Sequence, residues 1–239
     1  MDAADVFLQR FQEIEFHLRN LVEIDDTADF RAVLAAAIER SPEARRYQHD
    51  LRQFAMLRNA IVHRPRMGNR PIADPRPDVV ERIVAIRDAI LEPPSLVSVL
   101  HPGVTVAAVD MPIGEAAKRM LDGAYSQLPV LVDGRVVDVL TSEALSRYLT
   151  AVLLRDGRAD LDAPVGEVAP YDADRTYELV DASATVLAAL ELFERHDRAG
   201  TILHAVIVVK RQPGPLIAIA TNYDLPALFA AAAPYAWSS

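Results

Sequence analysis

The segment Tyr125-Ser-Gln-Leu-Pro-Val-Leu-Val-Asp-Gly-Arg-Val-Val-Asp-Val-Leu-Thr-Ser-Glu-Ala-Leu145 decides the fold of the larger part of the chain. Two apolar runs flank its Asp133-Gly134 dipeptide. This pattern is typical of a tight β-hairpin, because both central residues of that turn need a positive φ. Helical periodicity precedes the hairpin at Ile113–Leu121 and follows it at Ser142–Leu154. The region therefore predicts the order strand, helix, strand, strand, helix.

The same order recurs downstream, which indicates an internal repeat. The predicted elements are a strand at Tyr177–Asp181, a helix at Ala184–His196, strands at His204–Val209 and Leu216–Ala220, and a last helix from about Tyr223. Leu128-Pro-Val130 aligns with His204-Ala-Val206, and Thr141 aligns with Thr221. A longer turn at 210–215 accounts for the difference in spacing. Two β-α-β-β-α repeats are therefore expected.

Residues 95–235 resemble a tandem pair of CBS domains, also called a Bateman module, with repeats at 95–155 and 160–235. The resemblance lies in the Leu-Pro-Val strand, the turn and the Thr-Ser-Glu run of the quoted segment. Val165-Gly-Glu-Val-Ala-Pro170 resembles the short strand that enters the second repeat. Both repeats depart from the family pattern, because Asp138 and Ala218 stand where glycine is usual.

The resemblance implies a regulatory adenine nucleotide (AMP, ADP or ATP) in a cleft between the repeats. The hydroxyl and carboxylate of a Thr-x-x-Asp motif then contact the ribose, and the second repeat keeps both as Thr221 and Asp224. The first repeat has Ala144 in place of the acid, so one competent site is expected. The alternative is that Thr221 and Asp224 only cap the last helix. The resemblance assigns the walls around the base to Val168, His204 and Ala205.

The N-terminal part shows helical periodicity, with helices expected at 3–24, 28–40, 42–64 and 78–91 and an end at Pro93-Pro94. The first helix has a narrow apolar seam suited to helix–helix packing. The seam residues are Phe7, Phe11, Ile14, Leu18 and Leu21. We therefore expect a four-helix bundle over residues 1–92, and a fold class of α plus α/β for the chain.

The third predicted helix places a cation in line with an apolar stripe. The stripe consists of Tyr47, Leu51, Phe54 and Ile61, and Arg58 shares its register. Such a cation must be paired, reach water or be held for a ligand. His63 follows at the helix end that Pro65 sets. Five helical residues rotate by about 500°, so Arg58 and His63 point roughly 140° apart. A second copy on a two-fold axis brings both to one groove, which predicts a homodimer.

Arg58-Asn59-Ala60-Ile61-Val62-His63 resembles the Arg-x4-6-His motif of HEPN domains. In catalytic members the resemblance implies an endoribonuclease that needs no metal. Arg58 then stabilises charge on the phosphate, Asn59 orients it, and His63 exchanges a proton with the ribose 2′-OH or the leaving 5′-oxygen. The structural alternative is a buried ion pair for Arg58 and a favourable helix-end cation for His63.

The charge of the chain is unevenly distributed. The net charge of −9 argues against bulk nucleic-acid affinity, yet residues 44–70 hold seven arginines and one acidic residue. That basic segment is either a phosphate-binding footprint or a helix face neutralised by neighbouring acids. There is no cysteine, no signal-peptide pattern and no apolar run of the ~18 residues that a membrane span needs. A cytoplasmic protein without a membrane partner is expected.

Two functions fit these features. One is an RNA-cleaving helical domain regulated by a nucleotide bound to the CBS pair. The other is a non-catalytic nucleotide sensor whose helical half only dimerises or docks a partner.

Overall fold

A computed structural model describes residues 2–25, 27–63, 74–101, 103–171 and 177–232. The chain forms two compact units, whose main segments are residues 1–94 and 95–230. Among the described helices, none combines the length and the apolar character that a membrane span requires.

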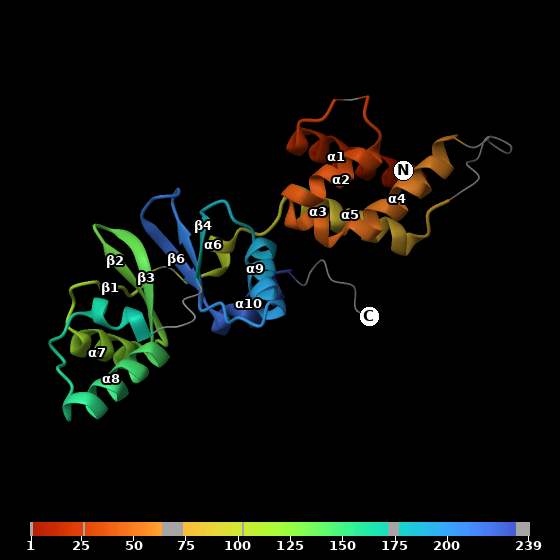
Figure 1. Cartoon of the computed structure of the whole chain (residues 1–239). Coiled ribbons are helices and arrows are strands. Elements are labelled where there is room, and N and C mark those ends of the chain that lie inside the picture. The colour runs from red at the N-terminus through yellow and green to blue at the C-terminus, as the bar shows by residue number, and fades with distance from the viewer. Residues whose placement is uncertain (1, 26, 64–73, 102, 172–176, 233–239) are drawn as a thin grey trace. The chain divides into compact units, whose positions relative to one another are not determined.

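The first unit is a helical bundle (Figure 1). Its helices are α1 (Ala3–Val22), α2 (Phe30–Arg40), α3 (Pro42–Arg46), α4 (Gln48–His63) and α5 (Pro77–Leu91). The helix expected at 42–64 is interrupted at Tyr47, whose backbone leaves helical geometry with φ −100° and ψ 14°. The ring of Tyr47 is buried, and the Arg82 guanidinium lies 5.5 Å from its centroid. The expected four helices are therefore five elements in the described part of this unit.

The apolar seam of α1 is the centre of the helical core. Phe7, Phe11, Ile14 and Leu18 are at most 1% exposed. Leu21 is 37% exposed and Val22 is buried in its place, so the stripe follows the 3.6-residue period of a straight helix rather than a 3.5-residue seam. Because these residues pack inside one chain, the seam does not provide a surface for a second copy.

The second unit contains the two expected repeats, each with a three-stranded sheet. The first has β1 (Ala107–Ala108), α7 (Ile113–Gly123), β2 (Gln127–Val132), β3 (Arg135–Thr141) and α8 (Ser142–Asp156). The second has β4 (Tyr177–Asp181), α9 (Val186–Arg198), β5 (Ala205–Val209), β6 (Leu216–Ala220), the 3-10 turn η3 (Asn222–Asp224) and α10 (Leu225–Ala232). In each sheet the first two strands are parallel and the last two antiparallel. The β2–β3 turn has φ 50° at Asp133 and 76° at Gly134, which confirms the predicted hairpin.

The two sheets of this unit pack against each other, and their helices lie on the outer sides (Figure 1). The buried contact consists of Val139 from β3 with Ala205, Ile207 and Val209 from β5. A hydrogen bond from Tyr177 Oη to the Val137 carbonyl, 3.1 Å long, joins the sheets. The repeats therefore share one apolar layer.

The segment that precedes each repeat in the sequence packs against the other repeat. The short helix α6 (Leu96–Val99) precedes the first repeat but contacts α9 of the second, and Leu96 N donates to Ala184 O at 2.9 Å. In return, Val165 N donates to Met111 O, also at 2.9 Å. This second entry segment forms the 3-10 turns η1 (Val165–Glu167) and η2 (Ala169–Tyr171), not the expected strand. Pro164, which precedes η1, and Pro170, within η2, have no N–H group for a strand ladder, and the only strand-like pairing of the described segment is the isolated bridge of Pro164 with Pro112.

Candidate functional site

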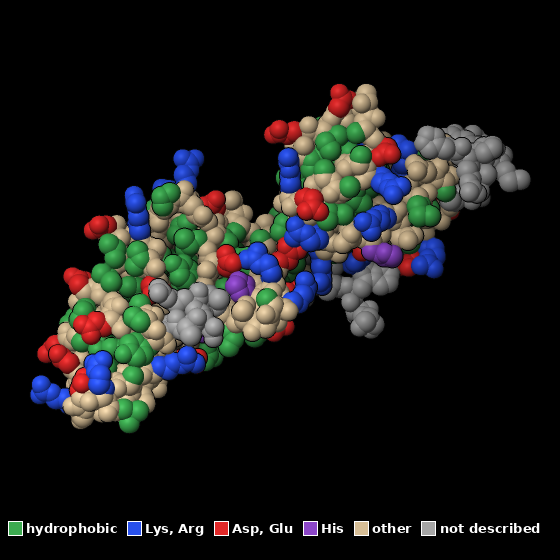
Figure 2. Space-filling model, viewed as in Figure 1, with side chains coloured by type: hydrophobic (Ala, Val, Ile, Leu, Met, Phe, Trp, Pro, Cys, Tyr) green, Lys and Arg blue, Asp and Glu red, His purple; other side chains and the backbone are tan. Residues whose placement is uncertain are grey.

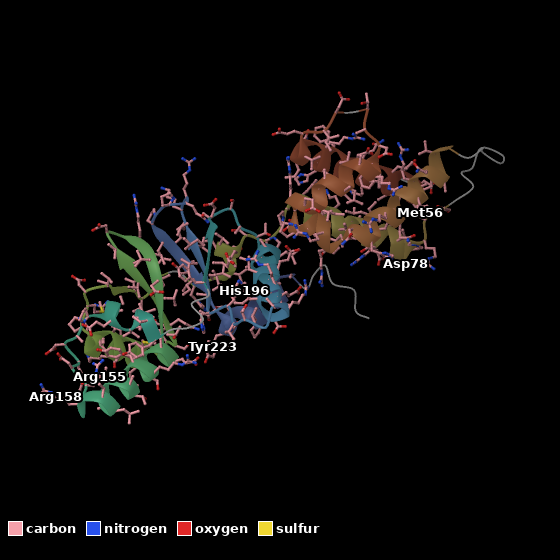
Figure 3. All side chains as sticks on the ribbon, viewed as in Figure 1. Met56, Asp78, Arg155, Arg158, His196 and Tyr223 are labelled. Atoms are coloured by element: carbon pink, nitrogen blue, oxygen red, sulfur yellow. The ribbon has the colours of Figure 1, made fainter. Side chains whose placement is uncertain are left out.

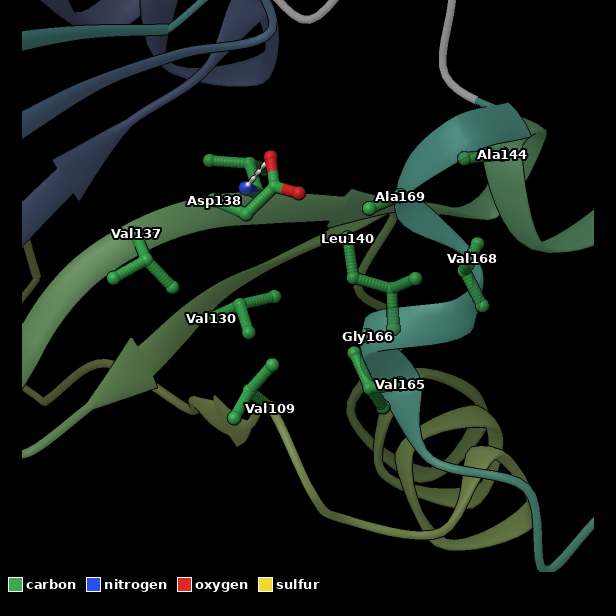
Figure 4. A pocket seen from close by; sticks show the side chains of 11 residues that line it. Val109, Val130, Val137, Asp138, Leu140, Ala144, Val165, Gly166, Val168 and Ala169 are labelled. Carbon is green, nitrogen blue, oxygen red and sulfur yellow. Dashed lines mark hydrogen bonds between the residues drawn. The ribbon is translucent and has the colours of Figure 1, made fainter.

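A cavity of about 200 Å³ lies between β3, the start of α8 and the turns η1 and η2 (Figure 4). Its walls are largely apolar and include Val109, Val130, Leu140, Ala144, Val165 and Val168. Asp138 is the one ionisable side chain in the described lining. Concave, mostly apolar sites with few polar groups are typical of small-molecule binding.

A β-bulge in β3 lies next to Asp138, which lines this cavity. Val130 pairs with Asp138, whereas Leu131 pairs with Val136, so Val137 is the extra residue on β3. Residues 137–140 all line the cavity, and in Figure 4 the Asp138 carboxylate lies on the opposite side of the β3 ribbon from the side chains of Val109 and Val130. Bulges twist a strand locally and redirect side chains. The Asp138 Oδ1 accepts a 2.9 Å hydrogen bond from Val139 N, as Figure 4 shows.

The wall formed by η1 and η2 is held tightly against the first repeat. Gly166 N donates to Val109 O at 2.9 Å, and a Cβ at position 166 would lie 3.0 Å from Val109 Cγ2, so only glycine fits without displacement. On the other side, Tyr148 Oη of α8 donates to Glu167 Oε2 at 3.1 Å. Burial, followed by this bond, raises the pKa of the Tyr148 phenol, which therefore stays protonated at neutral pH.

The Thr-Ser-Glu-Ala run of the first repeat caps α8. Thr141 Oγ1 accepts a 3.0 Å bond from Ala144 N. The Glu143 carboxylate binds Arg147 on the exposed face of the helix. The methyl group of Ala144 lines the cavity. The first repeat therefore has no carboxylate at the motif position, but it has one elsewhere in the same cavity, at Asp138.

In the second repeat, Thr221 and Asp224 form a capping box at the start of η3. Asp224 Oδ2 accepts bonds from Thr221 N at 2.7 Å and from Thr221 Oγ1 at 3.1 Å. In the described part of the chain, no bond to Asp224 Oδ1 is found. The capping interaction that the sequence allowed is thus present.

The three predicted wall residues occupy different surroundings. Val168 is 1% exposed and lines the cavity of the first repeat. Ala205 is fully buried in the layer between the sheets, and His204 is half-buried just before β5. The cavity therefore contains Val168 but not the other four predicted nucleotide-binding residues.

In the helical unit, Arg58 Nη1 donates to Asn59 Oδ1 at 3.1 Å. Both residues line a cavity of about 360 Å³ with Glu15, Arg19 and Arg31. This cavity adjoins a groove of about 630 Å³ between α2 and α4, because both have Phe30, Arg31, Ala55 and Asn59 in their linings. In Figure 2, blue Lys and Arg side chains lie among green hydrophobic ones on this unit. The side chain of His63 lies outside the described residues.

The basic segment 44–70 is partly structural. Arg45 donates to the Ile38 and Glu39 carbonyls at the end of α2, at 3.0 and 3.5 Å. Arg52 and Arg58 instead line the two cavities. The arginines at 64, 66 and 70 lie outside the described residues. Arg45 therefore has a structural role at the end of α2, whereas phosphate binding by the segment stays a prediction.

Comparison with known proteins identifies one family. Residues 97–151 match the model of the CBS domain. Comparison with curated proteins finds no match.

Similar solved structures include Hypoxic Response Protein I with two coordinated zinc ions (24% identity, 55% of this chain and 96% of that chain, TM-score 0.40). CBSX2 in complex with AMP is 18% identical and covers 59% of this chain and 96% of its own, with a TM-score of 0.42. CbpB in complex with c-di-AMP is 14% identical, and the match covers 65% of this chain and 96% of that chain, with a TM-score of 0.46. The family match to the first repeat and the recurrence of its fold in the second support the expected CBS pair in residues 95–230.

Proposed function

We propose that the chain is a regulatory protein whose CBS pair binds an adenine nucleotide and controls the helical unit. The observation that carries this proposal is the apolar cavity with a single described carboxylate, which lies within the repeat that matches the CBS model. Apolar walls favour burial of an aromatic base, and a carboxylate accepts hydrogen bonds from sugar hydroxyls.

The second repeat supplies the nucleotide site built on Thr221 and Asp224. A hydroxyl and a carboxylate three residues apart at a strand-to-helix turn can meet the two hydroxyls of a ribose. Support comes from Asp224 Oδ1, which has no bond among the described residues. His204, Ala205 and Val168 remain the proposed walls around the base.

We expect Asp224→Ala to weaken adenine-nucleotide binding by about 1.5–3 kcal/mol, because a charged acceptor is lost. Isothermal calorimetry with AMP, ADP and ATP measures this. Asp224→Ala also breaks the capping box, so the matched control is Thr185→Ala, which removes the side-chain cap of α9 in the same repeat. The control should lower the melting temperature and leave affinity unchanged. Equal affinity of Asp224→Ala and the parent would remove this site from the proposal.

For the helical unit we propose RNA cleavage at Arg58, Asn59 and His63. The supporting observation is that Arg58 and Asn59 line a cavity together with further arginines, next to a groove with an apolar floor. Guanidinium groups bind phosphates, and apolar side chains accept unstacked bases. The alternative is a helical unit that only dimerises or docks a partner, in which case the cavity receives a protein side chain.

We expect the protein to be a homodimer at micromolar concentration. Positions 58 and 63 are five residues apart on α4, and five helical residues rotate by about 500°, so one helix presents the two positions on different sides. Met56 of α4, labelled in Figure 3, is an apolar side chain that is 67% exposed, and a second copy would cover it. Light scattering measures the mass. A monomer would contradict a composite site made from two copies of α4.

A further inference from the structure

We infer that the groove between α2 and α4 of the helical unit docks an amphipathic helix of a partner protein, with Asp or Glu residues along both borders of the apolar face of that helix. The groove has a volume of about 630 Å³. The inference goes beyond the proposed function, because it concerns the binding of a protein and holds whether or not the helical unit cleaves RNA.

The first step is the shape of the groove. On α4 the lining positions recur at intervals of three and four residues, and on α2 they form two adjacent pairs one turn apart. The lining residues are Arg52, Ala55, Met56 and Asn59 on α4 and Phe30, Arg31, Leu34 and Ala35 on α2. The lining on α4 spans about two turns, or about 10 Å along the helix axis. A groove of this length between two helices accepts two turns of a third helix, whose side chains fit between those of α2 and α4.

The second step is the floor of the groove. Leu34 is 2% exposed and closes the floor from below. Ala35 and Ala55 have small side chains, which let the backbone of another helix approach closely. Met56, labelled in Figure 3, is 67% exposed, and its flexible thioether can adapt to the side chains of a partner. The floor therefore suits the aliphatic side chains of an amphipathic helix.

Aromatic rings in the groove decide between a helix and a nucleic acid. Single-stranded nucleic acids stack their bases on aromatic side chains. Phe30 is the one aromatic residue of the described lining, and it is partly buried, with its ring centroid 4.8 Å from that of Phe11 in the core. Little of that ring is left for stacking with a base. The proposed site of RNA cleavage lies in the adjoining cavity, so the groove is a separate surface.

The third step is the charge of the groove. Arg31 and Arg52 are both exposed, and each comes from one of the two helices that border the groove. Neither guanidinium has an ion pair or a hydrogen bond within the described part of the chain, and the described lining has no Asp or Glu. Charges at the border of an interface select the partner and fix its orientation. A helix with acidic borders therefore matches the groove, and a helix with basic borders is repelled.

Two acidic residues of the adjoining cavity do not offset this charge. Glu15 pairs with Arg19, with 2.6 Å between the carboxylate and guanidinium atoms. Asp29 is the N-cap of α2, and its Oδ1 accepts a 2.8 Å hydrogen bond from Ala32 N. Both carboxylates are thus engaged within the helical unit.

The fourth step is the consequence of docking for the adjoining cavity. Arg31 and Asn59 line both the groove and the cavity that contains Arg58. A helix in the groove therefore covers one edge of that cavity and restricts the access of RNA to it. This consequence alone rests on the proposed function.

Fluorescence anisotropy with the full-length protein and a designed, labelled helical peptide tests the inference. The peptide is about 15 residues long, with leucine at i, i+3, i+4 and i+7 and glutamate on both borders of that face. One comparison peptide has lysine in place of glutamate, and another has serine in place of leucine. We expect the acidic peptide to bind at least about tenfold more tightly than either comparison peptide.

Variants of the protein assign the binding to the groove. Arg52→Glu should weaken binding of the acidic peptide at least about tenfold and strengthen binding of the lysine peptide, a gain that a misfolded protein does not give. The control Arg158→Glu changes the net charge equally in the other unit and should bind like the parent. Ala35→Trp fills the groove without a change of charge and should abolish binding. Ala32→Trp alters the same helix outside the described lining and should leave binding unchanged.

Three outcomes would overturn the inference. The first is equal affinity for the acidic and the lysine peptides, and the second is an unchanged affinity for the acidic peptide in both Arg52→Glu and Ala35→Trp. The third is a groove that binds single-stranded oligoadenylate but not the acidic peptide, which makes it a surface for nucleic acid. Peptide binding without RNA cleavage would support the inference and remove the catalytic part of the proposed function.

Discussion

Replacing Arg58 by alanine, or His63 by alanine, is expected to reduce cleavage of single-stranded RNA at least about a hundredfold. In the proposed reaction the ribose 2′-oxygen attacks the adjacent phosphorus and the bond to the 5′-oxygen breaks. The 2′-OH proton is removed, and a proton is delivered to the leaving oxygen. Arg58 stabilises the charge that develops on the phosphate. The products carry 2′,3′-cyclic phosphate and 5′-hydroxyl ends, and EDTA should leave the rate unchanged.

Two control variants distinguish loss of catalysis from loss of folding and from a contaminating ribonuclease. His49→Ala changes a histidine on the same helix α4, and Arg76→Ala changes an exposed arginine of the same unit that pairs with Asp78. Both should cut RNA like the parent, and cleavage should slow as salt concentration rises. If Arg58→Ala or His63→Ala cuts at the parent rate, the activity is a contaminant. If Arg58→Ala mainly lowers the melting temperature, Arg58 is structural and the helical unit is a scaffold.

Phe7→Ala is expected to lower the unfolding free energy of the helical unit by about 3–5 kcal/mol, the usual cost of deleting a buried aromatic ring. Phe7 is fully buried. Its ring centroid lies 6.5 Å from that of Phe11 and 5.7 Å, edge-on, from that of Phe54. The lost contacts and the cavity left behind account for the loss. Urea unfolding followed by circular dichroism measures the change.

The matched control for this prediction is Phe16→Ala on the same helix. Phe16 is 69% exposed, so its removal should change the unfolding free energy by no more than about 0.5 kcal/mol. Similar losses for the two variants would contradict the packing of the α1 seam inside one chain. A loss for Phe7→Ala that depends on protein concentration would indicate that the seam contacts a second copy of the chain.

Local patterns in the sequence predict most of the second unit because its signals are short-range. Asp133-Gly134 requires positive φ at both turn residues, and the turn fixes the β2–β3 pairing. Helical periodicity likewise places α7, α8 and α9 within about two residues. Local patterns do not predict the break in the helix at Tyr47. The ring of Tyr47 contacts Arg82, a residue 35 positions away in the sequence, and such a contact leaves no local signal.

The candidate site is harder to predict from the sequence, because it too depends on contacts between residues that are far apart in the chain. Asp138 is visible in the sequence as a departure from glycine, but the cavity that it lines and the bulge opposite Val130 are not. Bulges have no reliable local signature in an apolar strand, since the register is set by both partners. A single signal was present: an acidic residue within a run of valines. Burial of a carboxylate costs free energy unless a hydrogen bond or an ion pair offsets it, so an acidic residue in such a run indicates a candidate site.

The exchange of entry segments bears on whether one repeat can exist alone. Val165 and Val168, which precede the second repeat, complete the core of the first. Leu96, which precedes the first repeat, is fully buried and its helix α6 packs on α9 of the second. Deleting either copy therefore exposes apolar residues of the other. A chain shortened to one repeat would therefore present an apolar surface to water, so each repeat depends on the other for a closed core.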